Sequence, residues 1–336
     1  MLLLLLALAL FPAADADPAW ERVVDLRGAW RFHLGDDLDR ARAGYDDEAW
    51  ESISVPAAWE DEGFWGYDGT AWYRRTFGLS KRDLDRPLYL HLGRVDDADQ
   101  VWVNGHFVGS TGRFPESGYE SAYFADRVYP VPAEYLRAGA NVVAVRVYDD
   151  GLDGGLLEGR IGVYALTNGP DLAVDLAGAW DFRPGDDTRS LPRSGWTTLT
   201  VPARWEPQGF PRLDGYAWYR RSFTLPDRLR SESLVLVLGR IDDLHEATLN
   251  GRRLGGSGGM DARAVRGTEW KALRAYRLDD VPLREKNEIV VRVYDAGYEG
   301  GIYDGPVGVM TEAAFDRWQS GGGLIDRLRS FFRLDG

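Results

Sequence analysis

The chain contains the same series of motifs twice, at a constant separation. Asn104-Gly105 recurs as Asn250-Gly251, and Arg146-Val147-Tyr148-Asp149 recurs as Arg292-Val293-Tyr294-Asp295. Since 250 − 104 and 295 − 149 both give 146, the period has the size of a domain. Solenoid repeats are much shorter, at roughly 20–50 residues. The sequence therefore predicts two tandem units, residues 20–166 and residues 171–310.

Each unit has the pattern of an all-β domain, in which short apolar runs alternate with Gly, Pro, Asn and Asp. Residues 88–92 and 142–148 are almost continuously apolar, which is typical of strands covered on both faces. Asn104-Gly105 lies between two such runs and predicts a hairpin with a type I′ turn. No long stripe of helical period occurs within either unit. We therefore predict two tandem antiparallel jelly-roll β-sandwiches.

The N-terminal residues 1–16 have the pattern of a signal peptide. A short apolar run, residues 2–11, is followed by Ala14-Asp15-Ala16, a small-x-small cleavage pattern. The run is too short to span a membrane as a helix, and no other integral membrane segment is predicted. No Lys or Arg precedes it, so a frayed apolar N-terminus of a cytosolic protein is the alternative. We expect export, to the periplasm or to the extracellular space.

Residues 311–336 are predicted to form a linker and a short amphipathic helix. Apolar residues repeat with helical spacing and would share one face; they are Leu324, Ile325, Leu328, Phe331 and Phe332. This helix either packs back onto a sandwich, lies on a membrane surface, or docks on a protein partner through residues 324–334.

The composition excludes several classes of function. The net charge is −13 and the pI is near 4.9, which argues against nucleic acid and against an anionic membrane surface as partner. The absence of cysteine excludes disulfides, thiolate metal sites and a cysteine nucleophile. The four histidines lack both a nucleophile motif and metal-ligand spacing. Neutral ligands remain open.

Several motifs together carry a resemblance to a known family. They are Gly28-Ala29-Trp30-Arg31-Phe32, Trp72-Tyr73-Arg74-Arg75, Gly93-Arg94-Val95-Asp96-Asp97 and Val101-Trp102-Val103-Asn104-Gly105. The chain resembles, over residues 20–166 and 172–309, the galactose-binding-like jelly roll that is the sugar-binding domain of family 2 glycoside hydrolases. It is also similar to the jelly-roll domain of sialate O-acetylesterases. The resemblance implies a carbohydrate partner, either galactoside-like or a polymeric glycan.

The same resemblance implies that the catalytic parts of those enzymes are missing. In family 2 hydrolases the catalytic glutamates lie on a separate barrel domain, for which we expect no room in this chain. The Gly-Asp-Ser block of the esterases is not matched, since Gly35-Asp36 is followed by Asp37. We therefore predict a non-catalytic, exported carbohydrate-binding protein. A structural or protein-interaction module of a glycan-degrading or sensing system is the alternative, and a glycosidase or acetylesterase with an unrecognised acid pair is the third.

Adjacent acids recur in both units, as Asp96-Asp97 and Asp242-Asp243. In a regular strand two adjacent side chains point to opposite faces, so we predict that Asp96 and Asp97 do not form a facing pair. A structural role is expected instead, either capping a turn or pairing with Arg94 and Arg240. No cofactor is predicted, although a structural calcium site made of Asp carboxylates and loop carbonyls stays open.

Aromatic residues in loops are the candidates for carbohydrate binding, since most of the recurring Trp residues are expected in the cores. The first unit has more of them, because Pro211 and Leu213 stand where it has Trp65 and Tyr67. If only one unit binds sugar, we predict the first. The candidate residues are Trp59, Phe64, Trp65, Tyr67, Asp68, Tyr119, Tyr123 and Asp153 in the first unit, and Trp205, Arg212 and Asp214 in the second.

Overall fold

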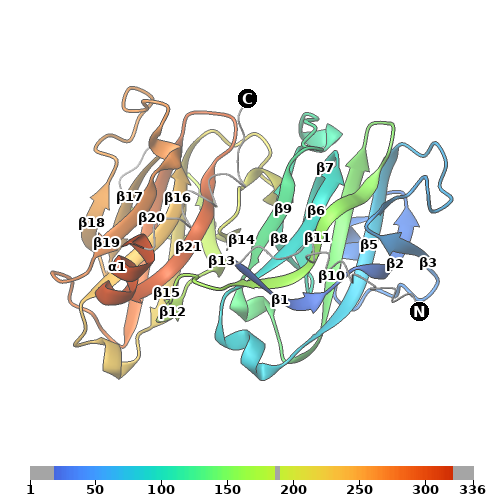
Figure 1. The fold of residues 1–336 in the computed structure, drawn as a ribbon. Helices are drawn as coiled ribbons and strands as arrows, with labels where there is room; N and C mark the ends of the chain where they lie inside the picture. The colour runs from blue at the N-terminus through green and yellow to red at the C-terminus, as the bar shows by residue number, and fades with distance from the viewer. Residues whose placement is uncertain (1–18, 186–189, 321–336) are drawn as a thin grey trace, which may run out of the picture.

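A computed structural model describes residues 19–185 and 190–320 of the chain. These residues form four antiparallel sheets, arranged as two β-sandwiches that lie side by side, and one α-helix (Figure 1). The predicted all-β fold of two sandwiches is confirmed. Seven short 3₁₀ turns join the strands: η1 (Leu38–Ala41), η2 (Lys81–Asp85), η3 (Pro115–Ser117), η4 (Ala133–Tyr135), η5 (Glu206–Gln208), η6 (Asp227–Leu229) and η7 (Glu269–Lys271).

The first sandwich packs a five-stranded sheet against a six-stranded one. The five-stranded sheet has the order β1 (Trp20–Asp25), β11 (Gly155–Leu166), β6 (Leu88–Asp96), β9 (Asp126–Val131), with β4 (Ala57–Ala58) also paired to β11. The six-stranded sheet has the order β3 (Glu51–Val55), β2 (Gly28–Leu34), β5 (Gly69–Leu79), β10 (Gly139–Asp149), β7 (Ala98–Val103), β8 (His106–Thr111).

The second sandwich repeats this topology. One sheet has the order β12 (Val174–Asp175), β21 (Gly301–Thr311), β16 (Leu234–Asp242), β19 (Leu273–Arg277). The other has the order β14 (Thr197–Val201), β13 (Gly178–Pro184), β15 (Gly215–Thr224), β20 (Lys286–Asp295), β17 (Leu244–Leu249), β18 (Arg252–Gly256). Apart from β4, each strand of the first sandwich has a counterpart at the same place in the second. The internal duplication of the sequence is therefore a duplication of the fold.

Each sandwich has its own apolar core, built by the inward faces of its two sheets. Trp30 and Phe32 of β2 are buried in the first core, and Trp180 and Phe182 of β13 occupy the same places in the second. The hairpin between β7 and β8 turns at Asn104-Gly105, where both residues have positive φ, 52° and 84°. Asn tolerates this conformation better than most residues, and the predicted type I′ hairpin is confirmed.

The α-helix α1 (Glu312–Ser320) follows β21 directly, in a stretch for which the sequence analysis predicted a linker. Its Ala314 and Trp318 pack on Val235 and Val237 of β16 and on Met310, which gives a short helix the apolar surface that it needs in water. The helix predicted within residues 324–334 and the signal peptide predicted at residues 1–16 lie outside the described residues. Among the described residues, none of the helices is long and apolar enough to cross a membrane.

One contact between the two sandwiches joins η4 of the first to β13, β14 and β15 of the second. Glu134 Oε2 lies 2.9 Å from Arg221 Nη2, and Glu134 Oε1 accepts from the backbone N–H of Ala179. The hydroxyl of Tyr135 lies 2.9 Å from that of Thr200. This contact fixes which parts of the two sandwiches face solvent.

Candidate functional site

Four loops meet at one edge of the first sandwich, and we call this region the loop end: residues 57–68, 94–97, 119–124 and 149–155. The pairing of strands brings them together, because Asp149 of β10 lies opposite Gly69 of β5, and Asp96 of β6 lies opposite Gly155 of β11. Backbone hydrogen bonds then join the loops: Trp59 N–H donates to Gly154 C=O at 2.9 Å, and Ala122 N–H donates to Asp97 C=O at 2.9 Å. In Figure 1 the loops after β8 and β10 rise at the upper edge of this sandwich.

Three carboxylates converge at the loop end, those of Asp96, Asp97 and Asp149. One oxygen from each lies within 4.8 Å of the others. The prediction that Asp96 and Asp97 cannot face each other is wrong. It assumed a regular strand through both residues, whereas β6 ends at Asp96 and Asp97 lies in the connection to β7. The expected pairing with Arg94 is also absent, since Arg94 pairs with Glu158.

Asp97 is held by three donors. Its Oδ2 accepts hydrogen bonds from the Tyr119 hydroxyl at 2.6 Å and from the backbone N–H of Asp150 at 3.0 Å. Its Oδ1 accepts from the Ser121 hydroxyl. Burial tends to raise the pKa of the Asp97 carboxyl, but the hydrogen bonds from Ser121 and Tyr119 outweigh burial and the pKa is lowered. Asp97 is therefore the member of the group that loses its proton most readily.

The other two carboxyls hold their protons more strongly. Burial, followed by the charges of Asp97 and Asp149, raises the pKa of Asp96 to about 7. Burial is also the main cause that raises the pKa of Asp149 to about 6, with the charges of Asp97 and Glu60 adding to it. Pairs of carboxyls with separated pKa values occur in acid–base catalysis, but they also occur in structural clusters.

One oxygen within this group, Asp149 Oδ2, is buried and has no hydrogen-bond partner. The same is true of Oε1 of a further acid, Glu60. The other oxygen of each side chain is fixed by a backbone amide, since Gly151 N–H donates to Asp149 Oδ1 at 2.9 Å and Gly154 N–H donates to Glu60 Oε2 at 3.0 Å. Neither Glu60 nor Asp149 is among the candidate residues that the sequence predicts. The signal that could have found both is that they recur, as Glu206 and Asp295.

The structure divides the aromatic candidates of the first unit into buried and exposed residues. Trp59 is fully buried with its indole N–H on Tyr67 C=O, so its proposed role as a sugar platform is wrong. Phe64 packs on the core, and the Tyr67 hydroxyl donates to Thr70 C=O at 2.7 Å. In contrast, the Trp65 side chain is 79% exposed.

The remaining candidates of the first unit lie at the surface of the loop end. Tyr119 and Tyr123 are exposed, as are Asp68 and Asp153. Phe124, which was not among the candidates, is exposed beside Tyr123 with their rings 5.5 Å apart. The loop end therefore presents exposed aromatic side chains together with the exposed carboxylates of Asp68 and Asp153.

The second unit repeats the acidic part of this arrangement but not the aromatic part. Asp242, Asp243 and Asp295 form the same group of three, again with one oxygen each within 4.8 Å. Arg127 corresponds to Arg274, so the offset in this loop is 147, and Arg266 and Thr268 stand where the first unit has Tyr119 and Ser121. The tyrosine donor is therefore absent, and a threonine replaces the serine. Trp205 is fully buried, which corrects its proposed role as a platform, while Arg212 and Asp214 are exposed.

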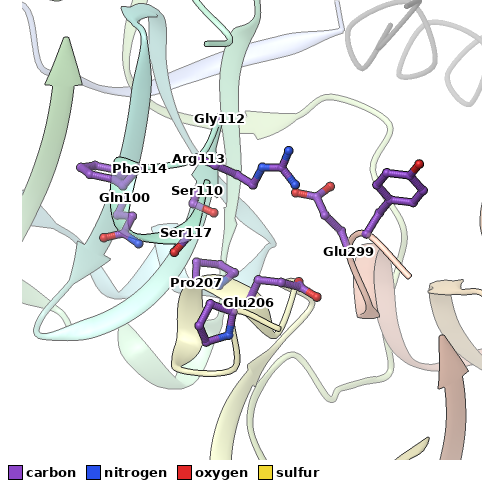
Figure 2. A pocket seen from close by; sticks show the side chains of 11 residues that line it. Gln100, Ser110, Gly112, Arg113, Phe114, Ser117, Glu206, Pro207 and Glu299 are labelled. Carbon is purple, nitrogen blue, oxygen red and sulfur yellow. The ribbon is translucent and has the colours of Figure 1, made fainter. Parts of the chain in front are cut away.

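A small pocket lies between the two sandwiches, and Figure 2 shows its lining. Residues of both sandwiches line it: Gln100, Ser110, Gly112, Arg113, Phe114 and Ser117 of the first, and Glu206, Pro207, Pro211, Tyr298 and Glu299 of the second. Ligand pockets usually measure about 300–1,000 Å³, whereas this cavity has a volume of about 40 Å³. It is too small for a sugar ring. Its second wall is the counterpart of the loop end, since Glu206 and Glu299 correspond to Glu60 and Asp153, so the first sandwich partly covers that edge of the second.

Comparison with known proteins shows that the first unit is similar to domains of β-galactosidases. Residues 36–153 match the family described as the β-galactosidase second all-beta domain. A β-galactosidase of Priestia megaterium is 29% identical over 152 residues, which cover 37% of this chain and 14% of that protein. A β-galactosidase of Bacteroides ovatus is 31% identical over 97 residues, or 25% of this chain and 11% of the enzyme. The chain thus spans a small part of the length of these curated relatives.

Solved structures of family 2 glycoside hydrolases also match the chain. A family 2 member from Bacteroides cellulosilyticus covers 82% of this chain and 31% of its own, with 17% identity and a TM-score of 0.36. A β-glucuronidase of the same family covers 83% of this chain and 27% of its own, with 14% identity and a TM-score of 0.38. These TM-scores are too low for the likeness of the whole chain to bear on function. In its coarser form the predicted resemblance holds: the chain resembles all-β domains of β-galactosidases and β-glucuronidases.

Proposed function

We propose that the chain is an exported, non-catalytic carbohydrate-binding protein, and that it binds glycans at the loop end of the first sandwich. The observation that carries the proposal is Trp65, a large apolar ring that is 79% exposed at an edge built of polar loops. Single exposed apolar residues are common, but a Trp buries a large area when it finds a partner, and its exposure loses that stabilisation. A sugar can stack the C–H face of its ring on such a side chain.

Other exposed residues of the loop end suit a neutral, hydroxyl-rich ligand. Asp68 and Asp153 offer carboxylate oxygens that accept from sugar hydroxyls, and Tyr119 and Tyr123 add further aromatic faces. No basic stripe accompanies them, and the net charge of −13 would repel polyanions. The first sandwich is the better candidate because the matching edge of the second faces the pocket between the sandwiches and lacks Trp65 and Tyr67.

Calorimetric titration against a panel of β-galactosides, β-glucuronides, sialosides and plant polysaccharides tests the proposal. We expect weak binding of at least one member, and Trp65→Ala should weaken that binding by about five- to thirtyfold, because stacking contributes on the order of 1–2 kcal/mol.

Tyr298→Ala is the matched control, since Tyr298 is an equally exposed aromatic residue, at 92%, on the second sandwich. It should leave the affinity unchanged. If the wild-type chain binds no member of the panel, the result contradicts the proposal and favours the alternative, a structural or protein-interaction module. Turnover of a chromogenic glycoside or acetyl ester would contradict the non-catalytic part.

A further inference from the structure

Each sandwich holds three aspartates whose carboxylate oxygens meet at the same place in its fold: Asp96, Asp97 and Asp149 in the first, and Asp242, Asp243 and Asp295 in the second. A buried glutamate, Glu60 or Glu206, lies near enough to Asp149 or Asp295 for their charges to interact. We call these four acids of each sandwich the acidic cluster. The backbone amides that hold them are also the same. Asp150, Gly151 and Gly154 donate in the first sandwich, and Ala296, Gly297 and Gly300 donate in the second.

In both clusters the same two carboxylates keep an oxygen without a donor. Asp149 and Asp295 are completely buried, and Oδ2 of each has no hydrogen-bond partner. Glu60 and Glu206 are 8% and 9% exposed, and one oxygen of each is also unpartnered. Buried polar atoms are nearly always satisfied, and leaving one unsatisfied loses about 1–3 kcal/mol. Four such oxygens at two equivalent places indicate that each cluster binds a positively charged partner.

Side-chain cations do not supply that partner. Among residues 19–185 and 190–320, no arginine or lysine forms an ion pair with a carboxylate of either cluster. The nearest guanidinium of the first cluster, Arg127, donates instead to the backbone C=O of Asp97 and to Asp99. Arg274 donates to the backbone C=O of Asp243 in the same way. Buried carboxyls without such partners either take up a proton or coordinate a metal ion.

The chemistry of the oxygens selects the class of ion. The three aspartate oxygens of each cluster lie within 4.8 Å of one another, close enough to share one ion such as Ca²⁺, whose ligands lie about 2.3–2.6 Å from it. Mg²⁺ demands near-ideal octahedral geometry and is seldom held by protein ligands alone, which favours Ca²⁺ at an all-protein loop site. Hard carboxylate oxygens in loops also match the preference of Ca²⁺ rather than that of zinc or copper.

We propose that each sandwich binds one calcium-sized divalent cation at its acidic cluster. The ion lies between the three aspartates, and the unpartnered glutamate oxygen completes its shell directly or through water. It ties the end of β6 to the loop after β10 in the first sandwich, and the end of β16 to the loop after β20 in the second. This inference does not depend on sugar binding and is tested without any glycan.

Calorimetric titration of CaCl₂ into chelator-treated full-length chain tests the proposal. We expect two sites per chain. Asp149→Asn should lose the first and Asp295→Asn the second, so that each variant binds one equivalent and the double variant binds none. Asp153→Asn is the matched control, because Asp153 is an exposed acid of the same loop, and it should keep both sites.

Thermal unfolding gives a second, independent measurement. Ca²⁺ at about 1 mM should raise the unfolding temperature of the wild-type chain and should leave that of the Asp149→Asn/Asp295→Asn variant unchanged. Removing a carboxylate from a crowded acidic cluster should not unfold the protein, since it relieves repulsion. Absence of Ca²⁺ binding by the wild-type chain, or equal binding by the double variant, would overturn the proposal. A response to Mg²⁺ as large as that to Ca²⁺ would overturn the choice of ion.

Discussion

The two sandwiches use different partners for the same buried arginine. In the first, the buried Arg127 guanidinium meets the Asp99 carboxylate at 2.7 Å. In the second, His245 replaces the aspartate, and Arg274 Nε donates to its Nδ1 at 3.1 Å. A neutral imidazole accepts this hydrogen bond, but an imidazolium cannot, because both of its nitrogens carry protons. The second sandwich therefore requires an uncharged His245.

This requirement predicts a loss of stability in acid. Burial, and then the Arg274 charge, lowers the pKa of His245 from 6.5 to about 3. Between about pH 6.5 and about pH 3, His245 is therefore protonated in the unfolded chain but not in the folded chain. The free energy of unfolding should fall by up to roughly 1.4 kcal/mol per pH unit on this account, from about pH 6.5 down to about pH 3.

Urea unfolding followed by tryptophan fluorescence, at several values between about pH 7 and about pH 4, measures this slope. His245→Asn keeps an acceptor for Arg274 but does not titrate, so it should lose less stability over this range than the wild type. Parallel curves for the two proteins would show that His245 does not set the slope.

At the scale of single residues, the sequence predicts some buried tryptophans correctly but not the burial of every loop residue. Trp30 and Trp180 were assigned to cores and are there. Trp59 was retained as a sugar candidate because it precedes a polar loop, yet that loop folds back over it and buries it. The meeting of Asp96 with Asp97 could not be predicted, because strand alternation fails where β6 ends, and the sequence does not mark that residue.

At the scale of the elements, a close approach of backbones shapes the sheet beside the loop end. β6 passes β11 at an irregularity where Gly93 has a φ of +61°. A Cβ at Gly93 would lie 1.9 Å from the carbonyl oxygen of Glu158, and one at the equivalent Gly239 would lie 2.2 Å from that of Asp304. Only glycine fits either position, for reasons of both contact and conformation.

Substitution of Gly93 by alanine should therefore destabilise the first sandwich by roughly 1–3 kcal/mol, through strain and overpacking against backbone that cannot move aside. Gly78→Ala in β5 is the matched control, since a Cβ there meets nothing within 4 Å and the φ of Gly78 is not positive. It should be neutral or slightly stabilising. Urea denaturation measures the free energy of unfolding of both variants. Equal stability of the two would contradict the prediction.

The strands and hairpins were predictable because two local signals agreed, the apolar runs and the Asn-Gly turn. The irregularity at Gly93 was not, because a glycine within a strand pattern can mark a bulge, a bend or a site of close approach. Helix α1 was missed for a similar reason: it has only nine residues, and its stability comes from Trp318 and Ala314 on β16 and β21. Such tertiary support leaves a weak trace in the local sequence.

At the scale of the whole molecule, the contact between the sandwiches decides which loops are open. Glu134 reaches from η4 to Arg221 and to the N–H of Ala179. It fits because residue 178 is glycine, where a Cβ would lie 1.8 Å from Glu134 Oε1. Because this contact positions the second sandwich, the edge that carries Glu206 faces the first sandwich, while the edge that carries Trp65 faces solvent.

Removal of this contact should uncouple the two sandwiches. Glu134→Ala leaves the Arg221 side chain, which is 15% exposed, without its carboxylate partner. We expect the total stability to fall by about 1 kcal/mol, as for other partly buried ion pairs, and calorimetric unfolding to separate into two peaks, one for each sandwich. Glu21→Ala is the control, since its partner Arg86 lies in the same sandwich. This variant should lower the unfolding temperature slightly, and its calorimetric unfolding should keep the single peak of the wild type. If Glu134→Ala leaves the shape of the wild-type curve unchanged, the sandwiches are coupled by other contacts or unfold independently already. In either case the Glu134 contact could not be what holds one loop end open and the other against its neighbour.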